Sequence, residues 1–201
     1  MNFKEYKYLI LSDYYRISGA FRWSVFIRHL LFGEVYKYVF WMRTCCFFKS
    51  HFLFKYFLYP PARLILERLK YKLGLSIPYQ TKIGSGFYIG HFGGIVINAS
   101  AIIGKNCNIS QGVTLGQANR GKNKGYPVIG DNVYIGPGAK IFGSVNVGNN
   151  VAIGANCVVT KDIPDNAVVI GVPGRIISYN GSNDYVNRVD YDKYLLNPFL
   201  E

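Results

Sequence analysis

Acidic residues are scarce in this chain of 201 residues. There are 11 Asp and Glu against 23 Lys and Arg, which gives a formal net charge of +12. The span between Glu67 and Asp131 contains no acidic residue at all. Any base or cation-binding group in that span must therefore be something other than a carboxylate.

The sequence also lacks the features of a secreted or membrane-spanning protein. No run of about 18 apolar residues is present, because basic residues interrupt the best candidate, 35–60. The first residues do not resemble a signal peptide. The spacing of the four cysteines matches neither a zinc site nor a disulfide framework: Cys45, Cys46, Cys107 and Cys157. We expect reduced cysteines, no metal site and a cytoplasmic location.

Glycine is nearly absent from the first third of the chain and abundant afterwards. Of the 22 glycines, 18 fall between Gly84 and Gly174. Before this region, Leu64, Leu66, Leu69 and Leu73 follow a proline pair at helical spacing. We expect a helical domain at 1–75, a repetitive β domain at 76–177 and a C-terminal tail at 178–201.

The expected helical domain is both basic and aromatic. Residues 1–75 hold 13 of the 23 Lys and Arg and 21 of the 33 aromatic residues. Such a segment suits an anionic surface, which could be a membrane leaflet, a polyanionic glycan or a nucleic acid, and we expect peripheral contact with the inner face of the membrane. The alternative is that these helices pack in an assembly and that their lysines are simply solvated. We do not expect a nucleic acid as partner.

An aliphatic residue recurs at every sixth position in the glycine-rich region. One run comprises Ile97, Ile103, Ile109 and Leu115; the other comprises Ile129, Ile135, Ile141, Val147, Ile153 and Val159. Short strands separated by tight Gly and Asn turns explain this period. Three such hexapeptides can close one triangular coil whose aliphatic residues stack on one another. The sequence therefore predicts a mainly β fold, a parallel β-helix preceded by helices.

Two interruptions of this period are candidate functional loops. The step from Ile89 to Ile97 is eight residues and contains His91, and the step from Leu115 to Ile129 is fourteen. Extra residues in a solenoid form loops on one face, which is often the binding face. His91 is one of three histidines in the chain, and a neutral imidazole can accept a proton from an attacking hydroxyl.

The region 83–177 resembles the hexapeptide-repeat acyltransferases, in particular the serine acetyltransferase branch and its relatives that O-acetylate capsule or exopolysaccharide sugars. The motifs that carry the resemblance are Gly90-His91-Phe92-Gly93-Gly94, Gln111-Gly112-Val113-Thr114-Leu115-Gly116, Ile135-Gly136-Pro137-Gly138-Ala139, Gly154-Ala155-Asn156-Cys157 and Gly171-Val172-Pro173-Gly174. The resemblance implies a left-handed coil, acetyl-CoA as co-substrate and a homotrimer, with a dimer of trimers as a larger alternative. It also implies active sites between subunits, with 117–128 reaching toward a neighbour.

The resemblance assigns roles to individual residues. It implies that His91 is the catalytic base. Acetyl-CoA is expected to contact amides and small side chains, with cations near its phosphates: Gly116, Gln117, Ala155, Lys161 and Arg175. Acceptor contacts are expected at Ser76, Gly90, Asn98 and Tyr126. Ser76, Asn98 or a backbone carbonyl could orient the His91 ring.

Several positions that are charged in serine acetyltransferases are neutral here. The residue before the histidine is Gly90 instead of Asp, the residue that aligns with the orienting carboxylate is Ser76, and Gly125-Tyr126 replaces Arg-His. A free amino acid needs charged partners for both of its ends. We therefore expect a polysaccharide or glycan precursor as acceptor. The alternatives are a serine O-acetyltransferase of cysteine biosynthesis and a non-catalytic β-helix scaffold.

Overall fold

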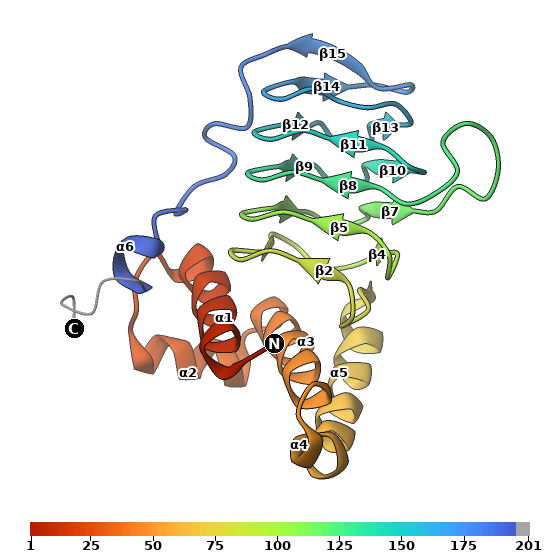
Figure 1. Ribbon diagram of the computed structural model, residues 1–201. Coiled ribbons are helices and arrows are strands. Elements are labelled where there is room, and N and C mark those ends of the chain that lie inside the picture. Colours follow the sequence, from red (N-terminus) through yellow and green to blue (C-terminus); the bar gives the residue numbers. More distant parts are fainter. Residues whose placement is uncertain (196–201) are drawn as a thin grey trace.

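The computed structural model describes residues 1–195 and begins with five helices. Their bounds are α1 Phe3–Ser18, α2 Trp23–Phe32, α3 Val35–Lys49, α4 Phe52–Phe57 and α5 Tyr59–Leu73 (Figure 1). The Asn2 side chain caps α1 by accepting from the Glu5 amide at 2.8 Å. Pro60 and Pro61 lie in the first turn of α5, where their missing amides are tolerated. Within the described residues, no helix is long and apolar enough to cross a bilayer.

Short strands follow and form three sheets. Sheet A contains β1 Leu75–Ser76, β4 Ile95–Ile97, β7 Thr114–Gly116, β10 Lys140–Phe142 and β13 Val158–Val159. Sheet B contains β2 Lys82–Ile83, β5 Ile102–Ile103, β8 Val128–Ile129 and β11 Asn146–Val147. Sheet C contains β3 Tyr88–Ile89, β6 Asn108–Ile109, β9 Tyr134–Ile135, β12 Ala152–Ile153, β14 Val168–Ile170 and β15 Arg175–Ser178.

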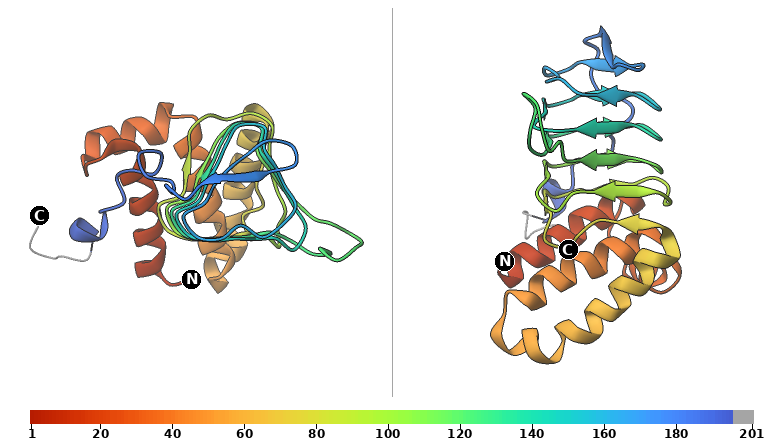
Figure 2. Two further views of the ribbon diagram at one scale, coloured as in Figure 1. Left: turned by 90° about the horizontal axis from the view of Figure 1, so that it is seen from above. Right: turned by 90° about the vertical axis from the view of Figure 1, so that its right-hand side faces the viewer.

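The three sheets are the sides of a coil with a triangular outline (Figure 2). Successive turns pair in parallel and in register, so that Ile97 lies beside Leu115 and Ile89 beside Ile109. Among the strands of residues 1–195, only β15 runs antiparallel to its neighbour, which is β14. The aliphatic residues of the period-six pattern are buried and stack along the axis. The predicted parallel coil with preceding helices is confirmed.

Asparagine side chains stabilise the turns between sheets B and C. Asn106, Asn132, Asn150 and Asn166 all have positive φ, a backbone conformation that Asn tolerates better than most residues. Their amides form a ladder, with Asn106 Nδ2 donating to Asn132 Oδ1 at 2.9 Å and Asn132 Nδ2 to Asn150 Oδ1 at 3.0 Å. The ladder holds successive turns at a constant spacing.

A buried ion pair joins the helices to the first turn of the coil. Asp13 of α1 accepts from Arg43 Nε of α3 at 2.9 Å and from the Phe87 amide at 2.7 Å. The Arg43 guanidinium also donates to the carbonyls of Ile83 and Gly84, each at 2.6 Å. These contacts satisfy polar groups at the base of the coil that would otherwise be buried without partners.

Candidate active site

His91 lies in the register break that the sequence analysis identified. The segment between β3 and β4 leaves sheet C and enters sheet A through Gly93 and Gly94, whose φ angles are 107° and 65°. A backbone with these angles favours glycine, so the break is encoded locally. The His91 side chain is exposed, and no described residue hydrogen-bonds to its ring. The imidazole is therefore free to contact a ligand.

The predicted site residues divide between two edges of sheet A. His91 and Ala155 lie where the chain passes from sheet C to sheet A. Gln117 and Lys161 lie at the other edge, where the chain passes from sheet A to sheet B. A strand of three residues spans about 10 Å. One chain alone therefore does not bring the two groups together.

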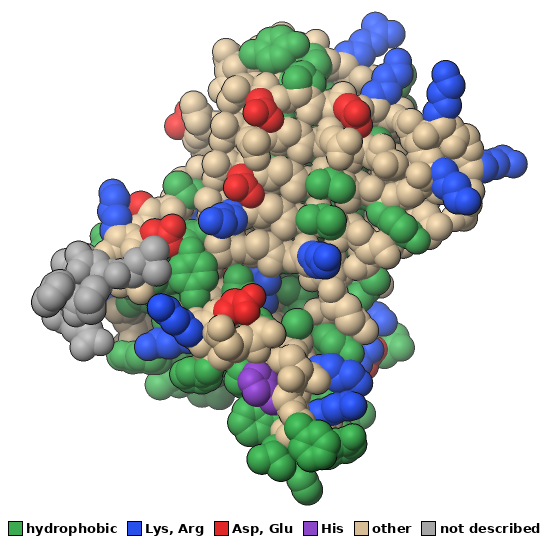
Figure 3. All heavy atoms as spheres, in the orientation of Figure 1, with side chains coloured by type: hydrophobic (Ala, Val, Ile, Leu, Met, Phe, Trp, Pro, Cys, Tyr) green, Lys and Arg blue, Asp and Glu red, His purple; other side chains and the backbone are tan. Residues whose placement is uncertain are grey.

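The second interruption forms a protruding loop at the edge between sheets A and B (Figure 1). Ala118 and Gly125 pair antiparallel, with amide–carbonyl distances of 3.1 and 3.0 Å. Asn123 Nδ2 donates to the Thr160 carbonyl at 2.5 Å and anchors the loop beside Lys161. The loop exposes the cations Arg120, Lys122 and Lys124. Basic side chains consequently gather on this side of the molecule (Figure 3).

The expected acceptor residues do not form one cluster. Ser76 pairs with Val96 on the outer face of sheet A. Asn98 follows β4 at the edge opposite His91, and its Oδ1 accepts from the Ser100 amide at 2.9 Å. Neither side chain hydrogen-bonds to the His91 ring, so neither orients it as the side chains stand. Tyr126 lies in the protruding loop, also away from His91.

One of the expected cofactor residues has an evident packing role. A side chain at Gly116 would collide with the Phe142 ring of the next turn, so this glycine is needed for close packing. Arg175 begins the antiparallel strand β15 and is exposed. Ala155 is also exposed at its turn. The latter two remain accessible to a ligand.

The cysteines offer no alternative nucleophile. Cys45 and Cys107 are buried, and burial raises the pKa of each thiol to about 12. The thiolate, which is the reactive form, is then scarce at neutral pH. Within residues 1–195, no three His, Cys, Asp or Glu side chains gather closely enough to hold a metal ion.

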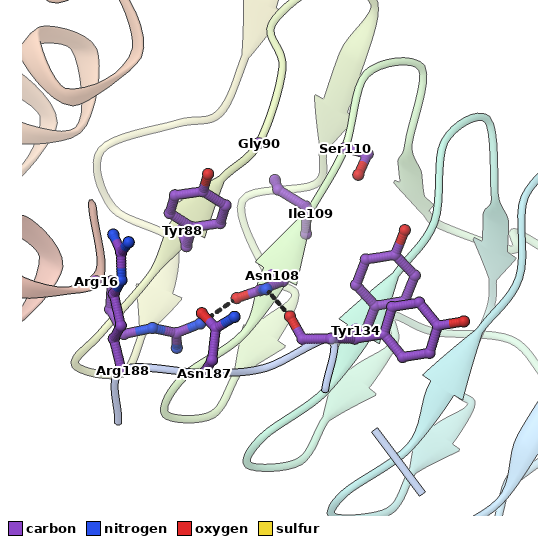
Figure 4. A pocket seen from close by; sticks show the side chains of 10 residues that line it. Arg16, Tyr88, Gly90, Asn108, Ile109, Ser110, Tyr134, Asn187 and Arg188 are labelled. Atoms are coloured by element: carbon purple, nitrogen blue, oxygen red, sulfur yellow. Dashed lines mark hydrogen bonds between the residues drawn. The ribbon is translucent and has the colours of Figure 1, made fainter. Parts of the chain in front are cut away.

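Sequence reasoning missed a pocket on the outer face of sheet C, beside His91. Gly90 and Ser110 line it from the coil, Arg16 from α1, and Arg188 from the C-terminal segment (Figure 4). These residues come from three distant parts of the chain, and no spacing rule connects them. The only local signal is that outward positions of β3, β6 and β9 carry polar or aromatic side chains.

This chain is similar to known proteins in both sequence and structure. A family profile described as bacterial transferase hexapeptide (six repeats) matches residues 126–161. A serine acetyltransferase of Bacillus pumilus is 41% identical over 139 residues, which are 69% of this chain and 63% of that protein. One from Staphylococcus aureus is 38% identical over 152 residues, 76% of this chain and 70% of that protein. The chain thus spans less than two thirds of the Bacillus relative.

The solved structures that resemble this chain include serine acetyltransferases as well. A Brucella abortus serine acetyltransferase in complex with coenzyme A has a TM-score of 0.67 and 30% identity, covering 88% of this chain and 68% of that chain. A Neisseria gonorrhoeae serine acetyltransferase in complex with serine has a TM-score of 0.61 and 27% identity, covering 87% and 68%. Both matches extend beyond the coil into the helical region.

The expectation of a polysaccharide or glycan acceptor is wrong. The relatives and solved structures described above are serine acetyltransferases. The expectation depended on neutral residues at Ser76, Gly90 and Gly125. A charged side chain that is missing at an aligned position can be replaced by one from a distant part of the chain. Arg16 and Arg188, for example, line the pocket beside Gly90. The chain therefore belongs to the serine acetyltransferase family, among the hexapeptide-repeat transferases.

Proposed function

We propose that this chain is an acetyl-CoA-dependent O-acetyltransferase that acetylates the hydroxyl of L-serine, with His91 as general base. The observation that carries the proposal is the exposed imidazole in a glycine-rich register break of a hexapeptide coil. The bound coenzyme A and serine in the Brucella and Neisseria relatives support the choice of donor and acceptor.

The reaction needs one proton acceptor and one oxyanion site. The His91 imidazole removes the proton from the serine hydroxyl as its oxygen attacks the thioester carbonyl of acetyl-CoA. The carbonyl becomes an oxyanion, which backbone amides can stabilise without a metal. The carbon–sulfur bond then breaks, and the imidazolium returns its proton to the leaving thiolate. The products are O-acetylserine and free CoA, and the acetyl group is transferred directly in a ternary complex.

We further propose a homotrimer of left-handed coils in which each active site lies between two copies. His91 and Ala155 occupy one edge of sheet A, whereas Gln117 and Lys161 occupy the other. A second copy could place its loop edge beside the His91 edge of the first. In this arrangement Gly116, Gln117 and Ala155 would contact the cofactor chain, and Lys161 and Arg175 would approach its phosphates. The helices (1–75) and the coil (76–177) are the two proposed domains.

Replacing His91 with alanine tests the catalytic role. We expect His91→Ala to lower turnover with L-serine by at least about 100-fold while leaving acetyl-CoA binding nearly unchanged, because only the proton acceptor is lost. Steady-state CoA release and a calorimetric titration with acetyl-CoA on the same preparation provide both measurements.

A histidine outside the coil provides the matched control. His51 lies at the start of α4, far along the fold from the register break, so His51→Ala should retain wild-type turnover. Near-normal turnover of His91→Ala would contradict the assigned base. Failure of the wild-type protein to release CoA with L-serine, while another hydroxyl acceptor is turned over, would contradict the proposed acceptor.

A further inference from the structure

A pocket of about 330 Å³ lies between the outer face of sheet C, α1 and the C-terminal segment. In Figure 4, Arg16 and Arg188 lie at one end, Tyr134 at the other and Asn108 between them. The C-terminal segment closes the pocket, because Ser182 Oγ donates to the Asn132 carbonyl at 2.5 Å and the Tyr185 carbonyl accepts from Asn108 Nδ2 at 2.7 Å.

The Arg16 side chain is almost fully buried and incompletely paired. It is 3% exposed, its Nη2 donates to Asn108 Oδ1 at 2.5 Å and its Nη1 donates to the Gly86 carbonyl at 3.3 Å. Its Nε has no hydrogen-bond acceptor among the described residues. Both existing acceptors are neutral, so they satisfy donors without neutralising the charge. A buried guanidinium ordinarily has an anionic partner.

The nearby carboxylate is already engaged. Asp13 forms its ion pair with Arg43 and accepts from the Phe87 amide, and Arg16 takes part in none of the ion pairs found in residues 1–195. Of the two buried guanidiniums, only that of Arg43 is therefore paired with a carboxylate. Arg188 adds a second positive charge at the pocket, held there by donation to the Ile17 carbonyl.

Among residues 1–195, no acidic side chain lines the pocket. The other lining residues contribute neutral hydrogen-bond donors and aromatic rings. Ser110 contributes a hydroxyl, and the Tyr134 and Tyr185 rings stack with centroids 4.5 Å apart. The pocket thus combines a cationic end with a polar and aromatic end, which is the usual arrangement of a small-molecule site.

We propose that this pocket binds a small oxyanion, a carboxylate or a phosphate, which pairs with Arg16 and Arg188. An oxyanion would neutralise the buried charge through charge-assisted hydrogen bonds, for which a guanidinium is well suited. Because Gly90 lines the pocket and directly precedes His91, an occupied pocket would lie next to the proposed base. The oxyanion can be the carboxylate of the acceptor, in which case the site rests on the proposed function, or a separate phosphate ligand.

Calorimetric titration without acetyl-CoA tests the site and separates its two sources. L-serine and inorganic phosphate are titrated separately into the full-length protein, Arg16→Met and Arg188→Gln. We expect saturable binding of at least one probe, weakened at least tenfold by Arg16→Met. A matched control is Arg68→Gln, which removes an exposed arginine of α5 that does not line the pocket and should leave binding unchanged.

Each outcome has a definite meaning. Serine binding that depends on Arg16 and Arg188 assigns the oxyanion to the acceptor, and phosphate binding with the same dependence assigns it to a separate ligand. Absence of saturable binding, or binding that none of the pocket variants weakens, overturns the proposal. If Arg16→Met does not fold, Arg188→Gln and Tyr185→Ala, both at exposed positions, decide the question. Turnover plays no part in this experiment, so its failure leaves the proposed activity untouched.

Discussion

The coil and two of the N-terminal helices, α2 and α4, differ sharply in how far their apolar side chains are buried. In the coil, the aliphatic residue at every sixth position points inward and is nearly inaccessible. In the helical region, α2 and α4 contain no buried residue at all, and large side chains such as Trp23, Phe32, Phe52 and Phe57 are exposed. Hydrophobic side chains gather at the bottom of the view in Figure 3, where the helices lie. The core of the coil is therefore complete within one chain, whereas α2 and α4 present an apolar surface suited to a partner.

The strongest test of this comparison breaks the junction between the two regions. Arg43→Met leaves Asp13 as a buried carboxylate without its ion-pair partner, which should lower the free energy of unfolding by about 3–5 kcal/mol. Urea denaturation measures the change. The exposed pair Arg63–Glu67 provides the control, because Arg63→Gln should cost less than about 1 kcal/mol. Equal effects of the two substitutions would show that the junction is not a special point of attachment.

A pair of truncations compares the two kinds of apolar residue directly. Ile135→Ala removes a fully buried side chain from the stack and should cost about 2–5 kcal/mol. Phe57→Ala removes a larger side chain that is 75% exposed and should change stability by no more than about 0.5 kcal/mol. The same urea titration measures both. A large loss of stability for Phe57→Ala would mean that the helical surface is covered by another copy in solution.

The smallest expected effect is on the binding of anionic vesicles by the exposed surface of α2. Arg22 and Arg28 lie exposed among its apolar residues, so we expect the full-length protein to float with anionic vesicles at low salt. Each cation near such a surface contributes about 1 kcal/mol, and replacing both with Gln should weaken binding about 30-fold. Protein that stays unbound and doubles its mass would instead identify α2 and α4 as an assembly surface.

The sequence predicted the coil well because its determinants are local. The spacing from Ile129 to Val159 fixes which side chains stack, and the Gly and Asn residues between them fix the turns. The two interruptions were predicted for the same reason, since a departure from a strict period is visible in the chain itself. His91 was identified because it lies inside one of them.

The pocket and the acceptor could not be predicted in this way. Arg16, Asn108 and Arg188 are far apart in sequence and meet only because α1 and the C-terminal segment both pack on sheet C. The glycan acceptor was inferred from neutral residues at aligned positions. That inference considered only the charges at these positions in the sequence. Recognition of a ligand depends on how charges are placed in space, and both arginines of the pocket come from segments outside the repeat.

The antiparallel last strand has a consequence for assembly along the coil axis. All turns of the coil before β15 pair in parallel with the turn that follows. An open end of such a coil could therefore pair with the coil of another molecule and grow into a fibre. At one end β15 reverses direction against β14, and at the other α3 and α5 cover the first turns. Both ends are thereby unsuited to continued parallel pairing, which limits growth to contacts across the sides of the coil.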